Sequence, residues 1–409
     1  MKSDLDQLME QHNLDAILIT GPAQHNPPMG YLTGTIHMTG GDLIKKNGSD
    51  PILFYNPMER DEASKSGFTT KNLADYRFDE LMKVSNGNIL QATILRYEKM
   101  LTDYGLSSGR IGIYGKMDVG SAFEIFSGIQ TKLPDVEFVG QLGDSLIMQA
   151  MATKDSDEVD RIRTMGEITT SVVSQVADFL TFQKSKNGML VDSSGNPILI
   201  GDVKKKINLW LTESGVENPE GTIFAIGRDA GVPHSTGNAK DILYLGQTIV
   251  FDIFPAEAGG GYFYDFTRTW CLGYAPDEVM ALYQDVLDVF QTIESELEVN
   301  ALCYQYQDRT CELFEEKGHP TIKSNPQTQE GYVHSLGHGV GLYIHEYPRF
   351  SSNVKEDRLA PGSVVTVEPG LYYPEKGMGV RLENTIWVRP DGEMEILADY
   401  PLDLVLPVK

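Results

Sequence analysis

The chain contains little cysteine. Its three cysteines, Cys271, Cys303 and Cys311, are separated by intervals that match no metal-site spacing. Disulfides form mainly in secreted proteins, so we expect these residues to be reduced, structural thiols in a cytoplasmic protein. The first 13 residues are polar and charged and lack the apolar run of a signal peptide, which favours the same location.

The chain also lacks long apolar runs and an excess of positive charge. No run of about 18 apolar residues is present, so no membrane span is expected. The sequence has 34 Lys and Arg residues against 58 Asp and Glu residues, which gives a net charge of −24. Nucleic acids and anionic membranes bind basic surfaces, so we expect neither as a partner. The acidic balance predicts a soluble protein.

The length of the chain predicts two domains, because 409 residues exceed one ordinary domain and a 41% hydrophobic fraction is enough for sizeable cores. Strand and helix signals alternate over about the first 150 residues, which is typical of an α/β domain. Beyond them, apolar residues recur at helical spacing across residues 159–179, so a helix opens the next domain. We therefore expect domains at residues 1–152 and 153–409.

Local pattern predicts individual loops, strands and helices along the chain. The polar, glycine-containing segment 183–195 predicts a mobile loop. Predicted strands in the first domain cover residues 15–20, 51–55, 110–114 and 136–139, and predicted helices along the chain cover 3–12, 88–104, 278–297 and 304–317.

Histidine is scarce as well, yet it is concentrated. Three of the eight histidines, His334, His338 and His345, lie within the 13 residues 334–346. Glycines alternate with other residues along this stretch, so backbone can come close to whatever the histidines face. Imidazole is the commonest metal-ligand side chain and the usual proton shuttle near neutral pH. On its own, the pattern fits a glycine-rich turn with ordinary histidines equally well, because short motifs over-match.

Acids inside strand-like segments decide between these interpretations. A carboxylate is costly to bury in an apolar strand unless it is paired or binds a metal. One such acid would be explained by an internal salt bridge, but four of them with a histidine cluster predict a shared cation site. The acids and their segments are Asp252 in residues 247–254, Asp265 in 262–271 after a glycine turn at 259–261, Glu368 in 363–370 and Glu383 in 378–388.

These segments resemble the pita-bread metallopeptidases, the family of Xaa-Pro dipeptidase, aminopeptidase P, methionine aminopeptidase and creatinase. Residues 334–346 have the form that Xaa-Pro peptidases carry, and Asp265-Phe266-Thr267-Arg268-Thr269 is similar to the family's Asp-x-Thr-Arg-Thr segment. The further segments that match are Glu368-Pro369-Gly370, Arg381-Leu382-Glu383 and, in creatinase-type N-terminal domains, Gly30-Tyr31-Leu32-Thr33-Gly34.

The resemblance covers nearly the whole chain and implies an α/β (α+β) fold. A creatinase-like N-terminal α/β domain would be followed by a pita-bread catalytic domain with a curved, mainly antiparallel sheet covered by helices. In this family the N-terminal domain mediates subunit contacts, so the resemblance implies a homodimer, with a tetramer as the alternative.

The resemblance also implies five metal ligands. Asp265 and Glu383 would bridge two divalent ions, Asp252 would complete one ion, and His338 and Glu368 would complete the other. A mostly oxygen-rich set with one imidazole favours Mn, with Co, Fe or Zn as alternatives. Bridging carboxylates place two ions about 3.5–4 Å apart, and a water held between them becomes a hydroxide near neutral pH. The 13 positions from Asp252 to Asp265 make a slightly longer hairpin than is usual in the family.

Other residues would serve the substrate. By the resemblance, Glu368 would carry the proton from the attacking water to the leaving amine. His234, in the loop of residues 227–234, and His345 would steady the substrate and the tetrahedral oxyanion, and His334 would line the leaving-residue side. Arg381 would orient a glutamate or the substrate carboxylate, and an ion pair to a neighbouring acid is an equally open role.

The implied function is a dinuclear-metal exopeptidase that hydrolyses Xaa-Pro bonds of small peptides, of the dipeptidase (prolidase) or the aminopeptidase P type. The Gly-His-Gly-x-Gly stretch is shared with methionine aminopeptidase, but His334 and the N-terminal domain argue against that activity. Two further classes stay open: a same-fold non-peptidase, which would be a creatinase-like amidinohydrolase or a lyase, and a metal-free binding module. A creatinase-like enzyme or a metal-free module would lack metal ligands, whereas this chain keeps all five.

Overall fold

The computed structural model describes residues 4–143 and 145–409. Contacts between Cα atoms divide the chain into two compact units. The first unit comprises Met1–Met151 together with Gly259–Gly261, and the second comprises Ala152–Ala258 and Tyr262–Lys409. Both units combine strands and helices, so the expected α/β class is confirmed.

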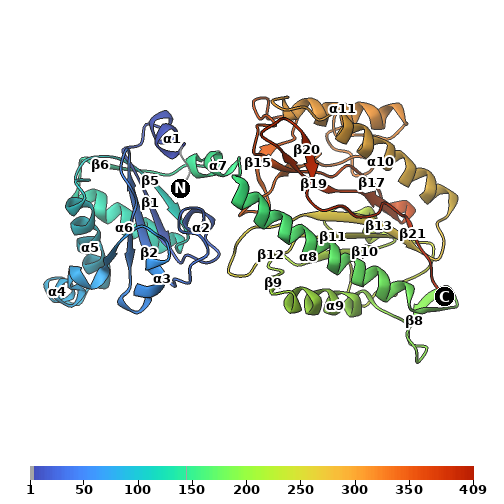
Figure 1. Cartoon of the computed structure of the whole chain (residues 1–409), viewed down its shortest axis with the longest axis horizontal. Coiled ribbons are helices and arrows are strands. Elements are labelled where there is room, and N and C mark those ends of the chain that lie inside the picture. The colour runs from blue at the N-terminus through green and yellow to red at the C-terminus, as the bar shows by residue number, and fades with distance from the viewer. Residues whose placement is uncertain (1–3, 144) are drawn as a thin grey trace. The chain divides into compact units, whose positions relative to one another are not determined.

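The first unit is built on a six-stranded mixed sheet with the order β4-β3-β2-β1-β5-β6 (Figure 1). The central strand β1 runs antiparallel to β2 and parallel to β5. All four strands predicted in this unit are present. The strands are β1 (Ala16–Gly21), β2 (Gly41–Lys46), β3 (Ile52–Tyr55), β4 (Thr69–Asn72), β5 (Gly109–Gly115) and β6 (Val136–Val139).

Helices α5 and α6 pack together in this unit, and the sheet shares its apolar core with them. Each begins at a polar cap, because the side chains of Asn88 and Asp118 accept hydrogen bonds from the first turn. Gly30–Gly34, expected only as a family segment, forms the end of α2. The helices are α1 (Leu5–Gln11), α2 (Pro27–Thr33), α3 (Arg60–Ser64), α4 (Phe78–Val84), α5 (Ile89–Asp103), α6 (Val119–Lys132) and α7 (Leu146–Met151).

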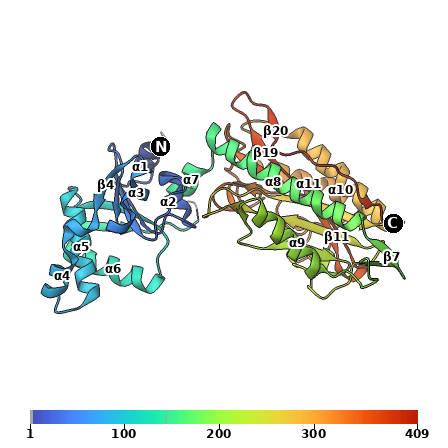
Figure 2. The same ribbon diagram turned by 60° about the horizontal axis from the view of Figure 1, so that its bottom comes forward.

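The second unit opens with a long helix, α8 (Ser156–Thr181), which crosses the unit in both ribbon views (Figures 1 and 2). Asp155 and Glu158 form a reciprocal capping box at its start, which satisfies backbone donors of the first turn. Helix α9 (Ile200–Glu213) packs beside α8. Helices α10 (Asp277–Glu296) and α11 (Cys303–Glu316) pack on each other, and α10 lies against β16–β18.

Two open sheets form the middle of the second unit. Their orders are β10-β11-β13-β21 and β15-β14-β16-β19-β20. Among the described strands of this unit, only β13 and β21 pair in parallel. The strands are β10 (Thr222–Ile226), β11 (Thr248–Ile253), β13 (Phe266–Leu272), β14 (His338–Gly339), β15 (Glu346–Arg349), β16 (Val364–Val367), β19 (Asn384–Val388), β20 (Met394–Ile396) and β21 (Val405–Leu406).

Three small hairpins or strand pairs complete the second unit. Residues 183–195 were predicted as a loop, but they contain the hairpin of β7 (Lys184–Lys186) and β8 (Met189–Val191). The strand pattern was missed because β7 is polar and exposed and has no alternation of apolar residues. Strand β12, within the long connection from Asp252 to Asp265, pairs with β9. The remaining strands are β9 (Val216–Glu217), β12 (Ala256–Glu257), β17 (Gly370–Tyr373) and β18 (Met378–Arg381), and β17 pairs with β18.

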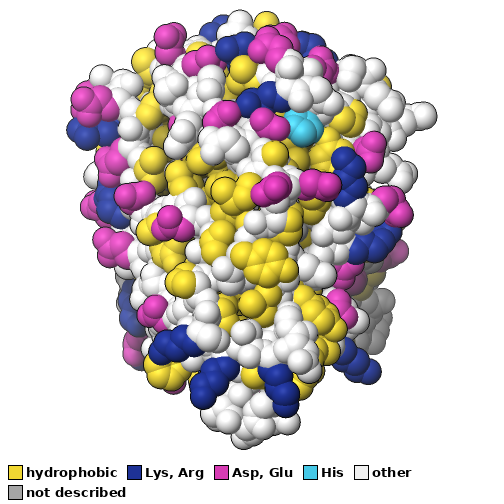
Figure 3. Space-filling view, turned by 90° about the vertical axis from the view of Figure 1, so that its right-hand side faces the viewer, with side chains coloured by type: hydrophobic (Ala, Val, Ile, Leu, Met, Phe, Trp, Pro, Cys, Tyr) yellow, Lys and Arg dark blue, Asp and Glu magenta, His cyan; other side chains and the backbone are white. Residues whose placement is uncertain are grey.

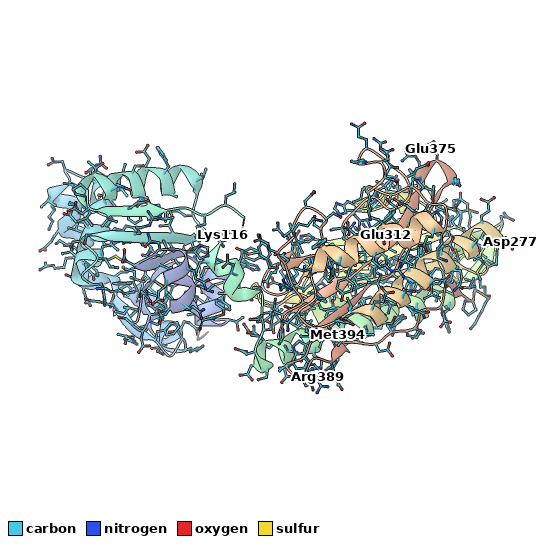
Figure 4. All side chains as sticks on the ribbon, turned by 90° about the horizontal axis from the view of Figure 1, so that it is seen from above. Lys116, Asp277, Glu312, Glu375, Arg389 and Met394 are labelled. Atoms are coloured by element: carbon cyan, nitrogen blue, oxygen red, sulfur yellow. The ribbon has the colours of Figure 1, made fainter. Side chains whose placement is uncertain are left out.

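The surface is charged and mixed. Asp277, Glu312 and Glu375 are exposed on the outside of the second unit (Figure 4). On the face seen in Figure 3, acidic and basic side chains are interspersed around an apolar strip. In the described part of the chain, no helix combines the length and the apolar character that crossing a membrane requires.

Candidate metal centre

The four predicted acids stand at the ends of strands from both sheets of the second unit. Asp252 is the penultimate residue of β11, and Asp265 directly precedes β13. Glu368 lies in the turn between β16 and β17. Strand ends are where the chain can turn a polar side chain toward open space while the strand itself stays buried, so these acids are positioned by the sheets on which the unit is built.

Glu383 occupies a break that the sequence pattern does not reveal. Residues 378–388 were predicted as one strand, but β18 ends at Arg381 and β19 begins at Asn384. The prediction of a continuous strand is wrong because the backbone leaves the β17–β18 hairpin and enters the five-stranded sheet here. The Glu383 amide donates to the Thr267 carbonyl oxygen at 3.1 Å, and the Arg268 guanidinium donates to the Glu383 carbonyl oxygen at 2.6 Å.

The carboxylates of Asp265 and Glu383 and the imidazole of His338 form a buried cluster. One potential ligand atom from each lies within 4.8 Å of the others. The Nε2 atom of His338 is 3.3 Å from the Glu368 carboxylate and 3.7 Å from the Asp265 carboxylate. The other ring nitrogen, Nδ1, is 3.0 Å from the Gly339 carbonyl oxygen, which fixes the ring so that Nε2 faces the acids.

The electrostatics of the site are unfavourable without a cation. Burial raises the pKa of Asp265 and Glu383 well above the usual range, and repulsion from neighbouring carboxylates adds to this effect. Burial also raises the pKa of Asp252, although Arg381 opposes the shift. Burial disfavours charge on Glu368 and His338, but their mutual hydrogen bond and the opposite charges around them together outweigh it. The pKa of Glu368 therefore falls to about 2 and that of His338 rises to about 9.

Two oxygen atoms in the site fit a cation directly. Asp252 Oδ1 and Glu383 Oε1 are buried, and among the described residues they have no hydrogen-bond partner. A buried carboxylate oxygen without a donor is costly, and a metal ion is one of the few groups that can satisfy it. Four carboxylates and one imidazole also make a donor set suited to Mn, Co, Fe or Zn.

All nine predicted site residues line one cavity of about 700 Å³. The enzyme hypothesis required the five expected ligands to share one pocket, and the structure brings them together. The predicted residues that line the cavity are His234, Asp252, Asp265, His334, His338, His345, Glu368, Arg381 and Glu383.

The three histidines outside the ligand set occupy different parts of the cavity wall. The ring of His345 packs edge-on against His338, with centroids 4.3 Å apart. Burial and the neighbouring His338 lower the pKa of His345 to about 4. Nε2 of His334 is 2.9 Å from the Tyr372 hydroxyl, and burial lowers the pKa of His334 as well. His234 lies in the loop after the short turn Asp229–Gly231.

Arg381 forms an ion pair, which is one of the two roles that its sequence context left open. Its Nη2 is 2.5 Å from the Asp252 carboxylate, and both side chains are buried. Its Nη1 donates to the Tyr372 hydroxyl at 2.8 Å and to the Pro233 carbonyl oxygen at 3.2 Å. Arg381 therefore fixes Asp252 and ties it to the wall that carries His334.

Several residues of the site were not predicted as functional residues from the sequence. The Thr267 hydroxyl donates to the Glu383 carboxylate at 2.7 Å, and its place in the Asp-x-Thr-Arg-Thr segment was the available signal. Arg349 and Glu220 also line the cavity. Arg349 follows the histidine stretch closely, but neither residue belongs to a pattern with chemical meaning, so only the folded chain shows where they lie.

Comparisons with known proteins find related sequences along the whole chain. Residues 160–390 match the model of metallopeptidase family M24, and residues 2–146 match the creatinase/prolidase N-terminal domain. The chain is 25% identical over 396 residues to the Xaa-Pro dipeptidase of Pyrococcus furiosus, an alignment that covers 96% of this chain and 97% of that protein. It is 24% identical over 403 residues to an uncharacterized peptidase of Bacillus subtilis, with 98% of each protein covered.

Solved structures share the fold. The Xaa-Pro dipeptidase from Bacillus anthracis matches with a TM-score of 0.76 at 22% identity, covering 98% of this chain and 97% of that one. The X-Pro aminopeptidase from Thermotoga maritima matches with a TM-score of 0.73 at 22% identity, covering 97% and 99%. At such identities the likeness shows the architecture of both units and leaves the substrate to be argued from the site.

Proposed function

The chain belongs to metallopeptidase family M24, and on this premise we propose that it is a metal-dependent exopeptidase that cleaves Xaa-Pro bonds in small peptides. The observation that carries the proposal is the convergence of four acids and one histidine, from segments spread over residues 252–383, on one buried cavity. Relatives called Xaa-Pro dipeptidase, and a fold shared with an X-Pro aminopeptidase, support the substrate class.

We assign two divalent ions per chain to this cavity, with Mn first and Co, Fe or Zn as alternatives. Asp265 and Glu383 would be shared between the ions, Asp252 would hold one, and His338 and Glu368 the other. The unpartnered oxygens of Asp252 and Glu383 support this assignment. When bound, such ions supply Lewis acidity that activates water and polarises a peptide carbonyl.

The side chains of the protein would move the protons and hold the substrate. Glu368 would take a proton from the attacking water and deliver it to the leaving amine, because its carboxylate lines the cavity beside His338. His345 and His234, both in the cavity wall, would donate hydrogen bonds to the developing oxyanion. His334, held by the Tyr372 hydroxyl, would line the side of the leaving residue.

The two arginines of the cavity would have separate tasks. Arg381 is committed to Asp252 and Tyr372, so it serves best to orient a metal-binding carboxylate. Arg349 is the second cation of the wall, and its guanidinium is 4.7 Å from the centre of the Tyr347 ring. We assign the carboxylate of a short peptide substrate to Arg349, because an arginine fork matches a carboxylate in geometry and charge.

The chemistry of the Xaa-Pro bond suits a site that does not bind its substrate as a β-strand. A peptide bond before proline is a tertiary amide without an N–H, and the ring bends the chain. A site that docks its substrate as an added β-strand would lack one donor for this bond. A cavity that would hold metal ions as Lewis acids and that offers several hydrogen-bond donors would not depend on that hydrogen bond, which favours Xaa-Pro substrates.

A substrate panel tests the proposal. The purified chain, loaded with Mn or with Co, is assayed against Xaa-Pro dipeptides, tripeptides containing Xaa-Pro, and Met-Ala peptides. We expect turnover of the Xaa-Pro set, and the ratio of dipeptide to tripeptide rates separates the dipeptidase from the aminopeptidase P type. Turnover of Met-Ala peptides alone, or of no peptide although two ions are bound, would refute the proposed substrate class.

The proposal also covers the domain boundaries, the location and the oligomeric state of the chain. We propose residues 1–152 and 153–409 as the N-terminal and the catalytic domain of a cytoplasmic homodimer, with a tetramer as the alternative. Light scattering on the purified chain measures the assembly directly. No observation in the site favours a creatinase-like amidinohydrolase, a lyase or a metal-free binding module over the peptidase.

A further inference from the structure

A buried ion pair lies behind the cavity wall. The Lys154 ammonium is 2.8 Å from the Glu346 carboxylate, and their side chains are only 2% and 0% exposed. Lys154 stands near the start of the second unit, 192 positions from Glu346 and outside every segment that suggested a metal site. Its own amide donates to the Gly362 carbonyl oxygen at 2.8 Å, which fixes the lysine backbone within this unit.

The Glu346 carboxylate is the centre around which the chain of residues 340–346 turns. The Tyr343 amide donates to it at 3.0 Å. Gly341 approaches so closely that an added Cβ would stand 2.4 Å from the nearer carboxylate oxygen. Glu346 also pairs with Gly339 between β15 and β14. The turn therefore has a charged core, and Lys154 supplies the countercharge.

Both ends of this turn carry residues of the cavity. His338 belongs to β14 at one end, and His345 immediately precedes Glu346 at the other. Their rings meet at 4.3 Å. Ile344, next to His345, packs on the small apolar cluster that contains Phe263 and Val340, so the turn is also held from its outer side. A shift of the Glu346 backbone would move the His345 ring directly.

We propose that Lys154 is a positioning residue for His345, acting through the Glu346 carboxylate and the turn of residues 340–346. Its importance for catalysis rests on the proposed function, in which His345 donates to the oxyanion. The placement of His345 by Lys154 is a structural statement that holds whichever substrate the enzyme takes.

The physical reason is the cost of an unpaired buried charge. Without Lys154, the Glu346 carboxylate would keep the Tyr343 amide as a donor but would lose its countercharge in a site with no exposed surface. Breaking one side of a buried pair is far more costly than replacing both partners, because the remaining charge must be neutralised or solvated. Here the turn would open to let water reach the carboxylate, and that change would displace His345.

The test begins with Lys154→Met, which removes the charge and keeps an apolar stem of similar length. In the metal-loaded full chain we expect kcat to fall about 10-fold to 100-fold, the range found when residues that orient a metal site are lost. KM and the number of bound ions should stay close to wild type, because the five metal-binding side chains remain. A simple loss of folded protein would instead lower the active fraction and the metal content together.

A second readout does not depend on activity. In the metal-free full chain with isotope-labelled histidine, the His345 ring signal is assigned by its absence in His345→Gln. We expect Lys154→Met to shift or broaden this signal and Lys154→Arg, which keeps the charge, to return it toward the wild-type position. In the double variant Lys154→Met/Glu346→Gln, a neutral amide still accepts from Tyr343, so we expect the signal and kcat to recover in part.

The matched control is Lys45→Met in the first unit. Lys45 is also 2% exposed and is 2.5 Å from its partner Asp6. Its replacement should leave kcat and the His345 signal unchanged. The proposal is overturned if Lys154→Met keeps wild-type kcat and the wild-type His345 signal, or if Lys45→Met produces the same losses. Should Lys154→Met not fold, Lys154→Arg and the double variant decide by the same two readouts.

The two proposals fail in different ways. A wild-type protein that binds two ions but cleaves no Xaa-Pro peptide refutes the proposed function, while the His345 signal still tests the role of Lys154. An active wild type whose His345 signal ignores Lys154 refutes this inference alone.

Discussion

The two units differ in how closely their buried acids lie together. In the first, Lys45 has its own counterion in Asp6, and buried Asp42 accepts a hydrogen bond from the Tyr97 hydroxyl at 2.7 Å. In the second, the four acids assigned to the metal site share one cavity with His338 and Arg381. Burial with mutual repulsion raises the pKa of Asp265 and Glu383. The second unit therefore holds a site whose crowded carboxylates favour a bound cation.

Asp265→Asn should have the largest effect, because it should lower activity and raise the stability of the metal-free protein. Loss of a residue that orients a metal ligand lowers activity about 10-fold to 100-fold. Loss of an assigned ligand itself should lower kcat/KM by more than this. The same change removes one of the crowded charges, so the metal-free variant should melt at a higher temperature than the metal-free wild type. Peptide hydrolysis and thermal melts measure the two effects. Full activity in the variant would remove Asp265 from the ligand set.

Metal binding should stabilise the second unit and leave the first unchanged. At a free Mn concentration of 100 times Kd, binding adds about 2.7 kcal/mol to the free energy of unfolding. We expect a higher Tm that a chelator reverses, with added hydrogen-exchange protection confined to residues 152–258 and 262–409. Fewer than one bound ion per chain after loading with Mn or Co would contradict the comparison and favour a metal-free module.

A variant of Glu294 tests whether burial also raises the pKa of an acid outside the cavity. This residue of α10 accepts a hydrogen bond from the Asn384 amide at 2.8 Å, yet burial outweighs that bond and raises its pKa from 4.5 to about 7. A raised folded-state pKa contributes stability that is fully present below about pH 4.5 and is lost as the pH rises through 7. Glu294→Gln should therefore stabilise the protein at pH 8 by about 1–3 kcal/mol, with a smaller gain at pH 5.

Urea titrations of the wild type and Glu294→Gln at pH 5, 6.5 and 8 measure this difference. An equal effect at all three pH values would show that the carboxyl does not titrate in this range. Glu312→Gln, on the exposed face of α11, is a control for the removal of one negative charge.

The smallest effect should come from the first unit. Lys45→Met breaks its ion pair with Asp6, but the Asp6 side chain is 46% exposed and stays hydrated. We expect a loss of about 1 kcal/mol in unfolding free energy, as for partly exposed pairs, and no change in kcat. A loss several times larger, measured by urea denaturation, would mean that the first unit also depends on strongly coupled buried charges.

Much of the site could be predicted from the sequence because its residues are unusual in their local context. An acid beside Ile253 and Phe251, or in the middle of residues 378–388, has no place in an ordinary strand, and the histidine cluster is equally conspicuous. The break at Glu383 was missed because the chain passes there from the β17–β18 hairpin to another sheet, and its backbone bonds to Thr267, 116 positions earlier. The role of Arg381 stayed open for the same reason, until the fold placed Asp252 beside it.

Other features leave no trace in local pattern. Strand β7 of the β7–β8 hairpin is polar and exposed, so its sequence pattern predicts a loop. Lys154 and Glu346 are an ordinary lysine and glutamate until the chain brings them together. The roles assigned to the nine cavity residues and the division at residue 152 remain predictions.

The distribution of the five assigned metal-binding side chains along the chain has a consequence for folding kinetics. Asp252 and Asp265 are 13 positions apart, and the other three follow only after residue 337, where Glu368 and Glu383 flank the β17–β18 hairpin. Contacts between such distant segments form late, because loop closure must come first. Cations should therefore find their site only after the folding transition state has passed. We expect saturating Mn to slow unfolding in stopped-flow experiments and to leave the refolding rate almost unchanged.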